Sequence, residues 1–305
     1  MLSPDILRQR IAEGIMAFPA TPFLPDGSLD QARHEAHVAL LAQHQPTALV
    51  AAGGAGEIFS LTLTEHEQVV RTTVHSSNGV PVIGGAAYGT LMACQMARAV
   101  ERAGGDAVLL LPPYLVRSEQ EGLFRHIRAV SQAVSIAVIP YSRDNAIITP
   151  QTMVRLAEVC PNIIALKEGT GDLQGVATLK SRVGDRLAIV NGAPTAEVLA
   201  PQFQALGVLS YSSAVFTFLP RLARHFFQAL RAGNQALVQA MLEQFYTPIV
   251  ELRHRKHGYS VSIVKAGLRV VGADAGLVRP PLVDFDAAEE ALLASLVTRA
   301  SQWNQ

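Results

Sequence analysis

Short apolar runs alternate with longer amphipathic stretches over most of the chain. A short run rich in β-branched and aliphatic residues is typical of a buried strand, whereas apolar positions that repeat every three or four residues indicate a helix. We predict strands at residues 14–19, 48–52, 81–85, 107–111, 136–141, 163–167, 187–191 and 208–210. Between them we predict helices at residues 30–43, 64–76, 91–103, 118–133, 150–159, 173–183 and 195–205.

This repetition of one strand and one helix predicts parallel βαβ units. Eight such units close into a (β/α)8 TIM barrel, an α/β fold of about 250 residues. Residues 1–218 are expected to form the barrel, and residues 219–305 a C-terminal helical extension packed on it. The helices of the extension are predicted at residues 219–232, 235–253, 261–271 and 287–300. An open, doubly wound sheet is the alternative, and the lack of a dinucleotide-binding glycine pattern counts against it.

Hydroxyl side chains are expected to begin four of the predicted helices. A serine or threonine before a helix can accept a hydrogen bond from one of the first free backbone amides. The caps are predicted at Thr64, Ser118, Thr149 and Thr195. The first two are followed three positions later by a glutamate, which is the pattern of a capping box.

Composition and charge narrow the function. Apolar residues make up 49% of the 305 residues and charged residues 16%, which suits a compact protein. The formal net charge is zero, so no overall field attracts nucleic acid or an anionic membrane. The two cysteines, Cys94 and Cys160, form no metal or redox motif and fit a reducing compartment. Without a membrane-spanning run or a signal peptide, the sequence predicts a soluble cytoplasmic protein with no nucleic-acid or membrane partner.

One lysine stands at the end of a predicted strand. Lys167 closes the apolar run of residues 163–167. Burial disfavours an ammonium ion, so the pKa of such a lysine falls and a free amine becomes available. A free amine can attack a carbonyl substrate and form a Schiff base. The alternative is that Lys167 reaches out of the strand to pair with the neighbouring Glu168.

Polar residues follow several other predicted strands. In a TIM barrel the carboxyl ends of the strands surround one mouth, where active sites lie. We therefore take the residues at these ends as candidate site residues, with Gly192 expected to line the substrate site. The group comprises Gly54, Ala55, Gly56, Tyr114, Tyr141, Arg143, Lys167, Gly192, Ser212 and Ser213.

Several of these motifs resemble a known family. Gly53–Glu57 with Ser60–Thr62, Tyr141–Asn145 and the strand that ends at Lys167 resemble the dihydrodipicolinate synthase / N-acetylneuraminate lyase family. The resemblance covers nearly the whole chain and implies a class I, Schiff-base lyase on a (β/α)8 barrel. More narrowly, the chain is similar to the 5-dehydro-4-deoxyglucarate dehydratase branch of that family. The stretches that carry this second resemblance are residues 18–23, 111–115, 141–146, 194–197, 211–216 and 259–267.

The resemblance implies a role for each matching position. Lys167 would form the Schiff base, and Tyr141 would relay protons. The turn through Gly54, Ala55 and Gly56 would present backbone amides to the carboxylate beside the ketone. Ala55 departs from the family, which usually has threonine or serine there. Alanine lacks the hydroxyl that, in the family, helps to bind this carboxylate and to pass protons through Tyr141.

Further residues are expected to bind the rest of the substrate. Arg143 can hold a second carboxylate with two parallel hydrogen bonds. Asn145, Ser212 and Ser213 would hydrogen-bond substrate hydroxyls or the distal carboxylate. By the same resemblance, Tyr114 would lie near a subunit contact of a homotetramer.

These expectations combine into one leading function and two alternatives. The leading function is a cofactor-free, metal-free dehydratase that converts a 2-oxo sugar acid, 5-dehydro-4-deoxyglucarate, into 2,5-dioxopentanoate, carbon dioxide and water. The first alternative is a pyruvate-type aldolase or synthase of the same family, acting like a 2-keto-3-deoxy sugar acid aldolase or dihydrodipicolinate synthase. The second is a non-catalytic barrel that binds a sugar acid, which the replacement at Ala55 motivates.

Other charged residues receive structural interpretations. His34 and His37 lie three positions apart without an evident third ligand, which argues against a metal site. The basic run Arg253–His257 is expected to complement a helix dipole. Lys265 lies in a predicted amphipathic helix and is expected to extend its amine to solvent.

Overall fold

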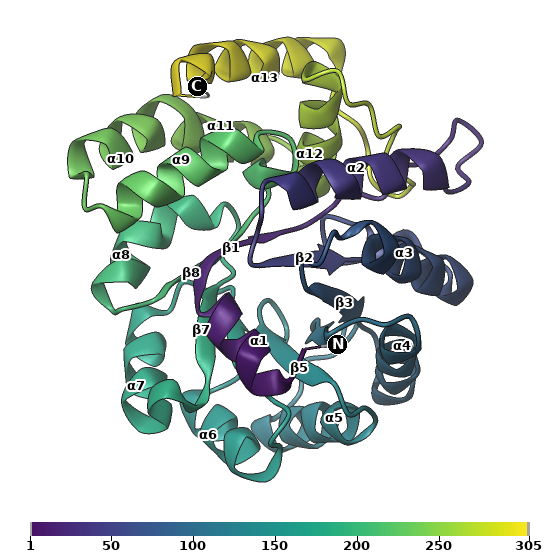
Figure 1. Cartoon of the computed structure of the whole chain (residues 1–305), viewed down its shortest axis with the longest axis vertical. Helices are drawn as coiled ribbons and strands as arrows, with labels where there is room; N and C mark the ends of the chain where they lie inside the picture. Colours follow the sequence, from purple (N-terminus) through teal and green to yellow (C-terminus); the bar gives the residue numbers. More distant parts are fainter. Residues whose placement is uncertain (1, 304–305) are drawn as a thin grey trace.

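The structure is a computed structural model that describes residues 2–303. Within these residues, eight parallel strands close into a barrel in sequence order (Figure 1). The strands are β1 (Glu13–Ala17), β2 (Ala48–Ala51), β3 (Val82–Ala86), β4 (Ala107–Leu110), β5 (Ala137–Ser142), β6 (Ala165–Glu168), β7 (Ala188–Asn191) and β8 (Leu209–Ser213). Because β8 pairs with β1, the TIM-barrel prediction is confirmed and the open doubly wound sheet is wrong.

A ring of helices surrounds the barrel, one after each strand (Figure 1). Its members are α2 (Gln31–Gln43), α3 (Leu63–Ser76), α4 (Thr90–Arg102), α5 (Gln120–Gln132), α6 (Pro150–Val159), α7 (Leu173–Val183), α8 (Ala200–Ala205) and α9 (Pro220–Arg231). The predicted helices at 150–159 and 173–183 match α6 and α7 residue for residue. The predicted strand ends differ by a few residues, because ladder hydrogen bonds and not apolar character decide where a strand stops.

A short helix at the N-terminus was not predicted. Helix α1 (Pro4–Ile11) lies across one end of the barrel (Figure 1). Its side chains Leu7 and Ile11 are completely buried and join the cluster of residues that fills the barrel interior. The available signal was Ser3, whose hydroxyl caps the helix. Eight residues are too few to display a convincing apolar period.

Two of the predicted helix caps lie elsewhere. Thr62 and Glu65, and not Thr64, form the capping box of α3. Both threonines are followed by a glutamate three positions later, so the pattern alone does not choose between them. At α5 the cap position is Glu119, and its side chain makes no capping hydrogen bond, so the prediction for Ser118 is also wrong.

The remaining two caps have opposite outcomes. The Thr149 hydroxyl accepts a hydrogen bond from the Thr152 amide at 3.3 Å, which confirms this cap. Thr195 precedes the 3₁₀ turn η3 (Ala196–Leu199) but makes no capping bond, so that prediction is wrong. The Thr195 hydroxyl instead accepts a hydrogen bond from the Arg253 guanidinium, which a helix-cap pattern cannot reveal.

Among the described residues, four α-helices follow the ring and gather on one side of the barrel (Figure 1). They are α10 (Gln235–Met241), α11 (Thr247–Arg253), α12 (Tyr259–Val270) and α13 (Ala287–Ala300). The single helix predicted at 235–253 is divided by a π-helical turn, η5 (Leu242–Tyr246). Pro248 follows this turn and has no amide hydrogen for the regular ladder, which accounts for the change of helical register.

The C-terminal helices share a core with the barrel. One cluster of buried apolar residues contains Ile15 and Tyr211 from the strands together with Phe226, Tyr246 and Tyr259 from the helices. Helix α9 also contacts β1 directly. The proposed division at residue 218 is therefore crossed by continuous packing. Among the described residues, no helix is both long and apolar enough to cross a membrane.

Candidate active site

Tyr141 and Lys167 lie side by side at the carboxyl ends of neighbouring strands. Strands β5 and β6 pair in parallel with Tyr141 opposite Lys167, so both side chains leave the sheet on the same face. The Lys167 amine lies 3.4 Å from the centre of the Tyr141 ring and 5.4 Å from that of the Phe18 ring. Lys167 is only 4% exposed and Tyr141 only 7% exposed. The fold therefore brings an amine and a phenol together in a site that is almost completely shielded from solvent.

Glycine makes room for this pair. A Cβ atom on Gly192 would lie 2.5 Å from Cγ and 3.0 Å from the amine of Lys167. A Cβ atom on Gly169 would lie 2.6 Å from the Tyr141 ring. The Tyr141 hydroxyl donates a hydrogen bond to the Gly192 carbonyl at 2.9 Å, and the Arg143 guanidinium donates one to the same hydroxyl at 3.2 Å. These contacts fix the phenol beside the amine.

Burial and charge both tune the pair. Burial lowers the pKa of Lys167 below its ordinary value, although the neighbouring Tyr141 acts to raise it. Burial acts to raise the pKa of Tyr141, but the nearby Lys167 and Arg143 outweigh it, so this pKa is also lowered. A lower lysine pKa increases the fraction of nucleophilic amine, and a lower phenol pKa makes Tyr141 a better proton carrier.

The pair opens into a cavity of about 310 Å³. This volume is in the range of small-molecule sites, which begins at about 300 Å³. Most of the wall is apolar, and its polar groups come from the strand ends and the C-terminal helices. The polar and charged residues of the wall are Tyr141, Arg143, Asp144, Lys167, Thr195, Ser212, Arg253 and Ser260.

The predicted site residues divide into two groups in the structure. Those that line the cavity with Lys167 and Tyr141 are Gly54, Ala55, Arg143, Gly192 and Ser212. Within the described part of the chain, the Ala55 amide donates no hydrogen bond, which leaves it available to a ligand. Arg143 also forms an ion pair with Asp144 at 3.0 Å.

The other four predicted residues lie outside the cavity wall. Asn145 donates hydrogen bonds to the Pro113 and Val116 carbonyls, both at 2.7 Å, and so fastens the loop after β4. The Ser213 hydroxyl donates to the Glu197 carboxylate. Ser213 alternates with Ser212 and Ala214, which do line the cavity, as the two-residue period of a strand requires. Asn145 lies in the turn after β5, where that period no longer applies.

Gly56 and Tyr114 lie in the loops that follow β2 and β4. A Cβ atom on Gly56 would lie 3.3 Å from the Ala52 backbone, so glycine here serves the tight turn. Tyr114 is 66% exposed and packs edge-on against Tyr88, with ring centres 6.4 Å apart. Within this single chain its side chain does not reach the cavity.

Glu168 does not pair with Lys167. Its carboxylate accepts hydrogen bonds from the Thr170 amide at 2.7 Å and the Gly171 amide at 2.9 Å, which orders the loop after β6. Among residues 2–303, Lys167 forms no ion pair with a carboxylate. The alternative of a simple strand-end ion pair is therefore wrong.

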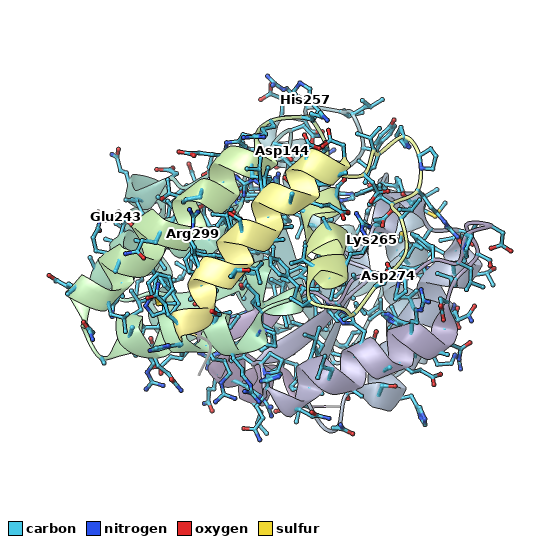
Figure 2. The ribbon with its side chains drawn as sticks, turned by 90° about the horizontal axis from the view of Figure 1, so that it is seen from above. Asp144, Glu243, His257, Lys265, Asp274 and Arg299 are labelled. Carbon is cyan, nitrogen blue, oxygen red and sulfur yellow. The ribbon has the colours of Figure 1, made fainter. Side chains whose placement is uncertain are left out.

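A buried ion pair fixes the other end of the glycine-rich turn. The Lys265 amine lies 2.8 Å from the Glu57 carboxylate, and both side chains are completely buried. Lys265 also donates to the Leu277 carbonyl at 2.8 Å, and Glu57 accepts from the Arg279 amide at 3.0 Å. Figure 2 shows Lys265 on α12, beside α13. The expectation that Lys265 reaches solvent is wrong, because its amine is enclosed by the loops that carry Phe23, Glu57 and Leu277.

The histidines that were considered as metal ligands are structural. His34 contacts the Ala20 carbonyl at 3.2 Å and the Thr73 hydroxyl at 3.0 Å. His37 accepts a hydrogen bond from the Ala20 amide at 3.3 Å. Burial lowers the pKa of His34 to about 4 and that of His37 to about 3, so both rings are neutral at physiological pH.

The C-terminal helices supply wall residues that the sequence did not indicate. Ile249 and Arg253 come from α11, and Ile263 comes from α12. Figure 2 shows Asp144, after β5, and His257, after α11, at the same end of the molecule. Arg253 belongs to the basic run that was assigned to a helix dipole, and only the packing of α11 turns it toward the cavity.

Comparisons with known proteins agree on one family. The model of the Dihydrodipicolinate synthetase family matches residues 11–300. A relative from Bradyrhizobium diazoefficiens, named "Probable 5-dehydro-4-deoxyglucarate dehydratase", is 46% identical over 98% of this chain and 95% of its own length. A relative of the same name from Saccharopolyspora erythraea is 49% identical over 96% of each chain.

Solved structures share the architecture. The crystal structure of dihydrodipicolinate synthase from Bacillus clausii has a TM-score of 0.88 and 26% identity, and the match covers 97% of this chain and 99% of that one. The corresponding synthase from Oceanobacillus iheyensis has a TM-score of 0.90 over 98% of this chain and 100% of that one, and its 24% identity supports the fold alone. The extension after the barrel is included in both matches.

Proposed function

The chain belongs to the Dihydrodipicolinate synthetase family, and we propose that it acts as a decarboxylating 5-dehydro-4-deoxyglucarate dehydratase. The proposal draws its substrate from the relatives that carry this name at 43–49% identity over nearly the whole chain. The observation that carries its chemistry is the buried Lys167 amine, 3.4 Å from the Tyr141 ring centre. This arrangement supports Schiff-base formation without a metal or an organic cofactor.

The first half of the reaction prepares an electron sink. The neutral Lys167 amine attacks the ketone carbon beside the carboxylate, and Tyr141 delivers a proton to the departing hydroxyl as water leaves. The resulting cationic imine withdraws electrons from the neighbouring methylene group. Tyr141, as phenolate, then accepts a methylene proton, and the electron pair of the broken C–H bond forms an enamine.

The second half eliminates two small molecules. The enamine returns its electron pair and expels the β-hydroxyl, which takes a proton and leaves as water. The cationic imine is now conjugated toward the distal end of the substrate. The electron pair of the bond to the distal carboxylate flows into this system as carbon dioxide leaves. Proton uptake and hydrolysis of the imine release 2,5-dioxopentanoate and free Lys167, so the net losses are one water and one carbon dioxide.

The charges of the cavity wall suit an acid with two carboxylates. Arg143 and Arg253 line the cavity with Lys167, and Asp144 is the acidic residue among the described wall residues. A turn at Ala55 with a free amide adds a donor for one carboxylate. We assign Lys167 and Tyr141 catalytic roles. We assign substrate-binding roles to Gly54, Ala55, Arg143, Gly192 and Ser212.

Turnover of a substrate panel tests the proposal. The purified chain is incubated with 5-dehydro-4-deoxyglucarate, with 2-keto-3-deoxygluconate, with N-acetylneuraminate, and with pyruvate plus aspartate semialdehyde. We expect 2,5-dioxopentanoate and carbon dioxide in equal amounts from the first substrate. Absence of both products there removes the dehydratase proposal.

The same panel identifies the alternatives. Cleavage or condensation of the other substrates favours a pyruvate-type aldolase or synthase. Borohydride reduction of the mixtures, followed by mass spectrometry, records any imine as a covalent adduct on Lys167. Sugar-acid binding without an adduct from any of the oxo acids favours a non-catalytic barrel.

We also propose that the chain works as a homo-oligomer, a tetramer by family resemblance, in the cytoplasm. Exposed apolar side chains on the loop after β4 support an assembly. Tyr114, Leu115 and Val116 are 66%, 79% and 59% exposed, and Leu91 in the first turn of α4 is 87% exposed. Light scattering of the purified chain and of Leu115→Asp tests this, and an unchanged mass in the variant excludes the loop as a contact.

A further inference from the structure

Arg253 is a buried cation on the cavity wall, and no carboxylate in the described part of the chain pairs with it. Its side chain belongs to α11 and is 7% exposed. It donates hydrogen bonds to the Thr195 hydroxyl and to His254 Nε2, the latter at 2.9 Å. Its Nε has no hydrogen-bond partner, and among residues 2–303 it forms no ion pair.

An unpaired buried guanidinium is costly to keep. Taking a cation out of water is unfavourable by several kcal/mol unless an anion or a set of acceptors replaces the water. Burial lowers the pKa of Arg253, and Arg143 across the cavity lowers it further. The opposing influence is Glu197, whose own pKa is raised to about 7 by burial, so near neutrality this carboxyl is only partly charged.

Thr195, the partner of Arg253, holds an unfavourable backbone conformation. Its φ of 50° lies in the left-handed region, which β-branched residues rarely adopt. Such strain persists where the surrounding structure imposes it, and it is concentrated at functional sites. Thr195 lines the same cavity. Its hydroxyl accepts a hydrogen bond from Arg253 and does not cap the 3₁₀ turn that follows. The strained residue therefore orients the guanidinium.

Arg143, the other arginine of the cavity wall, already has two side-chain partners. Arg143 donates to the Tyr141 hydroxyl at 3.2 Å and pairs with Asp144 at 3.0 Å. Its charge therefore serves the phenol and is partly neutralised by a carboxylate. Arg253 lines the same cavity and forms no ion pair among the described residues, so its charge remains for an incoming carboxylate to neutralise.

We infer that Arg253, oriented by Thr195, is a specificity-determining residue that binds the distal carboxylate of a 2-oxo dicarboxylic acid. The inference rests on the proposed function for the identity of that acid. The barrel supplies the reacting amine, and the C-terminal extension supplies the anion site that selects two carboxylates over one. Arg143 keeps its substrate-binding role at the cavity wall beside the Tyr141 hydroxyl, and the distal role that the sequence analysis expected for it passes to Arg253.

This assignment predicts a particular split of the kinetic constants. An arginine that holds the distal carboxylate attracts it most strongly before carbon dioxide leaves, because the negative charge moves off the carboxylate as the carbon–carbon bond breaks. This attraction is therefore expressed when the substrate binds, where it lowers KM without raising kcat. Removing Arg253 is therefore expected to raise KM for 5-dehydro-4-deoxyglucarate more than it lowers kcat, whereas removing a group that acts on the reacting atoms lowers kcat.

Two acids that differ only at the distal end give a direct test. 2-Oxoadipate and 2-oxohexanoate have the same six-carbon chain, and only the former carries a second carboxylate. The concentration that gives half-maximal borohydride-trapped adduct on Lys167 is measured for each acid with wild type, Arg253→Gln, Arg253→Lys and Arg255→Gln. Arg255 is the matched control, an exposed arginine two positions away.

Wild type is expected to prefer 2-oxoadipate. Arg253→Gln is expected to raise its half-maximal concentration by about tenfold or more, the effect of one lost charge-assisted contact, with at most a twofold change for 2-oxohexanoate. Arg253→Lys should recover part of the preference, and Arg255→Gln should leave it unchanged. If Arg253→Gln does not fold, Arg253→Lys carries the test, with a selective loss expected because lysine lacks the planar fork.

Three results overturn the inference. These are no preference in wild type, an unchanged preference in the Arg253 variants, and an equal loss for both acids. The last result would make Arg253 a structural residue. The proposed function fails separately: a chain that yields no 2,5-dioxopentanoate but shows the Arg253-dependent preference keeps its dicarboxylate site and loses the dehydratase assignment.

Discussion

Two buried lysines in this barrel have different surroundings. Lys167 ends β6 inside the mouth, and its nearest functional neighbour is the Tyr141 phenol. Lys265 lies on α12, where the Glu57 carboxylate is 2.8 Å from its amine. Both are almost completely removed from solvent, at 4% and 0% exposure. The difference between them is the counter-charge: Lys265 has a carboxylate partner, whereas Lys167, to which we assign the Schiff base, has none among the described residues.

The two sites obey the same electrostatic rule with different results. Burial lowers the pKa of both lysines. At Lys265 the Glu57 carboxylate opposes this change and stabilises the ammonium as one half of an ion pair. At Lys167 the opposing group is a phenol that can itself take up or release the proton. An amine without a permanent counter-ion is free to lose its proton and attack a ketone.

The largest expected effect is the loss of activity in Lys167→Met. Methionine has nearly the length of lysine and a similar apolar chain, but it lacks the amine that acts as the nucleophile. We expect turnover to fall by about 10⁴-fold or more, with no borohydride-trapped adduct. Stability should stay within about 1 kcal/mol of wild type or increase, because the variant no longer buries an amine without a carboxylate. Turnover and chemical denaturation measure the two quantities, and a large destabilisation would contradict the comparison.

The next effect concerns the phenol and the pH dependence of imine formation. Tyr141→Phe is expected to lower the rate of adduct formation by about 10²- to 10⁴-fold, the range for a lost proton carrier. The rate rises with pH as Lys167 becomes neutral. Tyr141 raises the pKa of Lys167, so its removal lets burial lower that pKa further.

The rising limb of the pH profile should therefore move to lower pH in Tyr141→Phe, while the maximum rate falls. Initial rates of adduct formation between pH 5 and 10 measure both changes. A limb that stays in place or moves to higher pH would show that Tyr141 does not hold the amine in its charged form.

The third effect is structural and comes from Lys265→Met, the same substitution at the other lysine. It leaves the Glu57 carboxylate buried without its cation, which typically costs about 3–5 kcal/mol. Denaturant unfolding measures this loss, and the adduct on Lys167 should still form in the folded fraction. The double variant Glu57→Gln/Lys265→Met is the control. It removes both charges while an amide oxygen remains for the Arg279 amide, so part of the lost stability should return.

The sequence predicted the location of Lys167 but not that of Lys265. Lys167 ends a short apolar run, which predicts the carboxyl end of a strand. In a TIM barrel the carboxyl ends of all the strands lie at the mouth. Tyr141 could be placed beside it because consecutive strands of a barrel are neighbours. Lys265 lies on a helix, whose period indicates which residues share a face but not what covers that face. Glu57, its partner, is more than two hundred residues away in the sequence.

Arg253 was missed for the same physical reason. A basic run at a helix end is most simply explained by the helix dipole, and nothing local indicates that one member enters a cavity. The π-helical turn before Pro248 changes the register of α11, and tertiary packing then sets the direction of the Arg253 side chain. Ser213 and Asn145 differ in kind. Their chain neighbours Asp144 and Ser212 do line the cavity. The sequence therefore predicted the correct end of the barrel for these two residues but not the direction of their side chains.

The smallest expected effect comes from the turn that joins the two lysine sites. Ala55 lines the Lys167 cavity, and Glu57, two positions later, holds Lys265. Ala55→Ser adds a hydroxyl to the cavity without touching the ion pair, so stability should change by at most about 0.5 kcal/mol. One added hydrogen bond of about 1 kcal/mol should lower the half-maximal pyruvate concentration for adduct formation by about fivefold. Ala55→Val, which adds volume without a donor, should weaken pyruvate binding instead. If both variants weaken it alike, space and not hydrogen bonding decides the residue at this position, and the alanine belongs to the shape of the site.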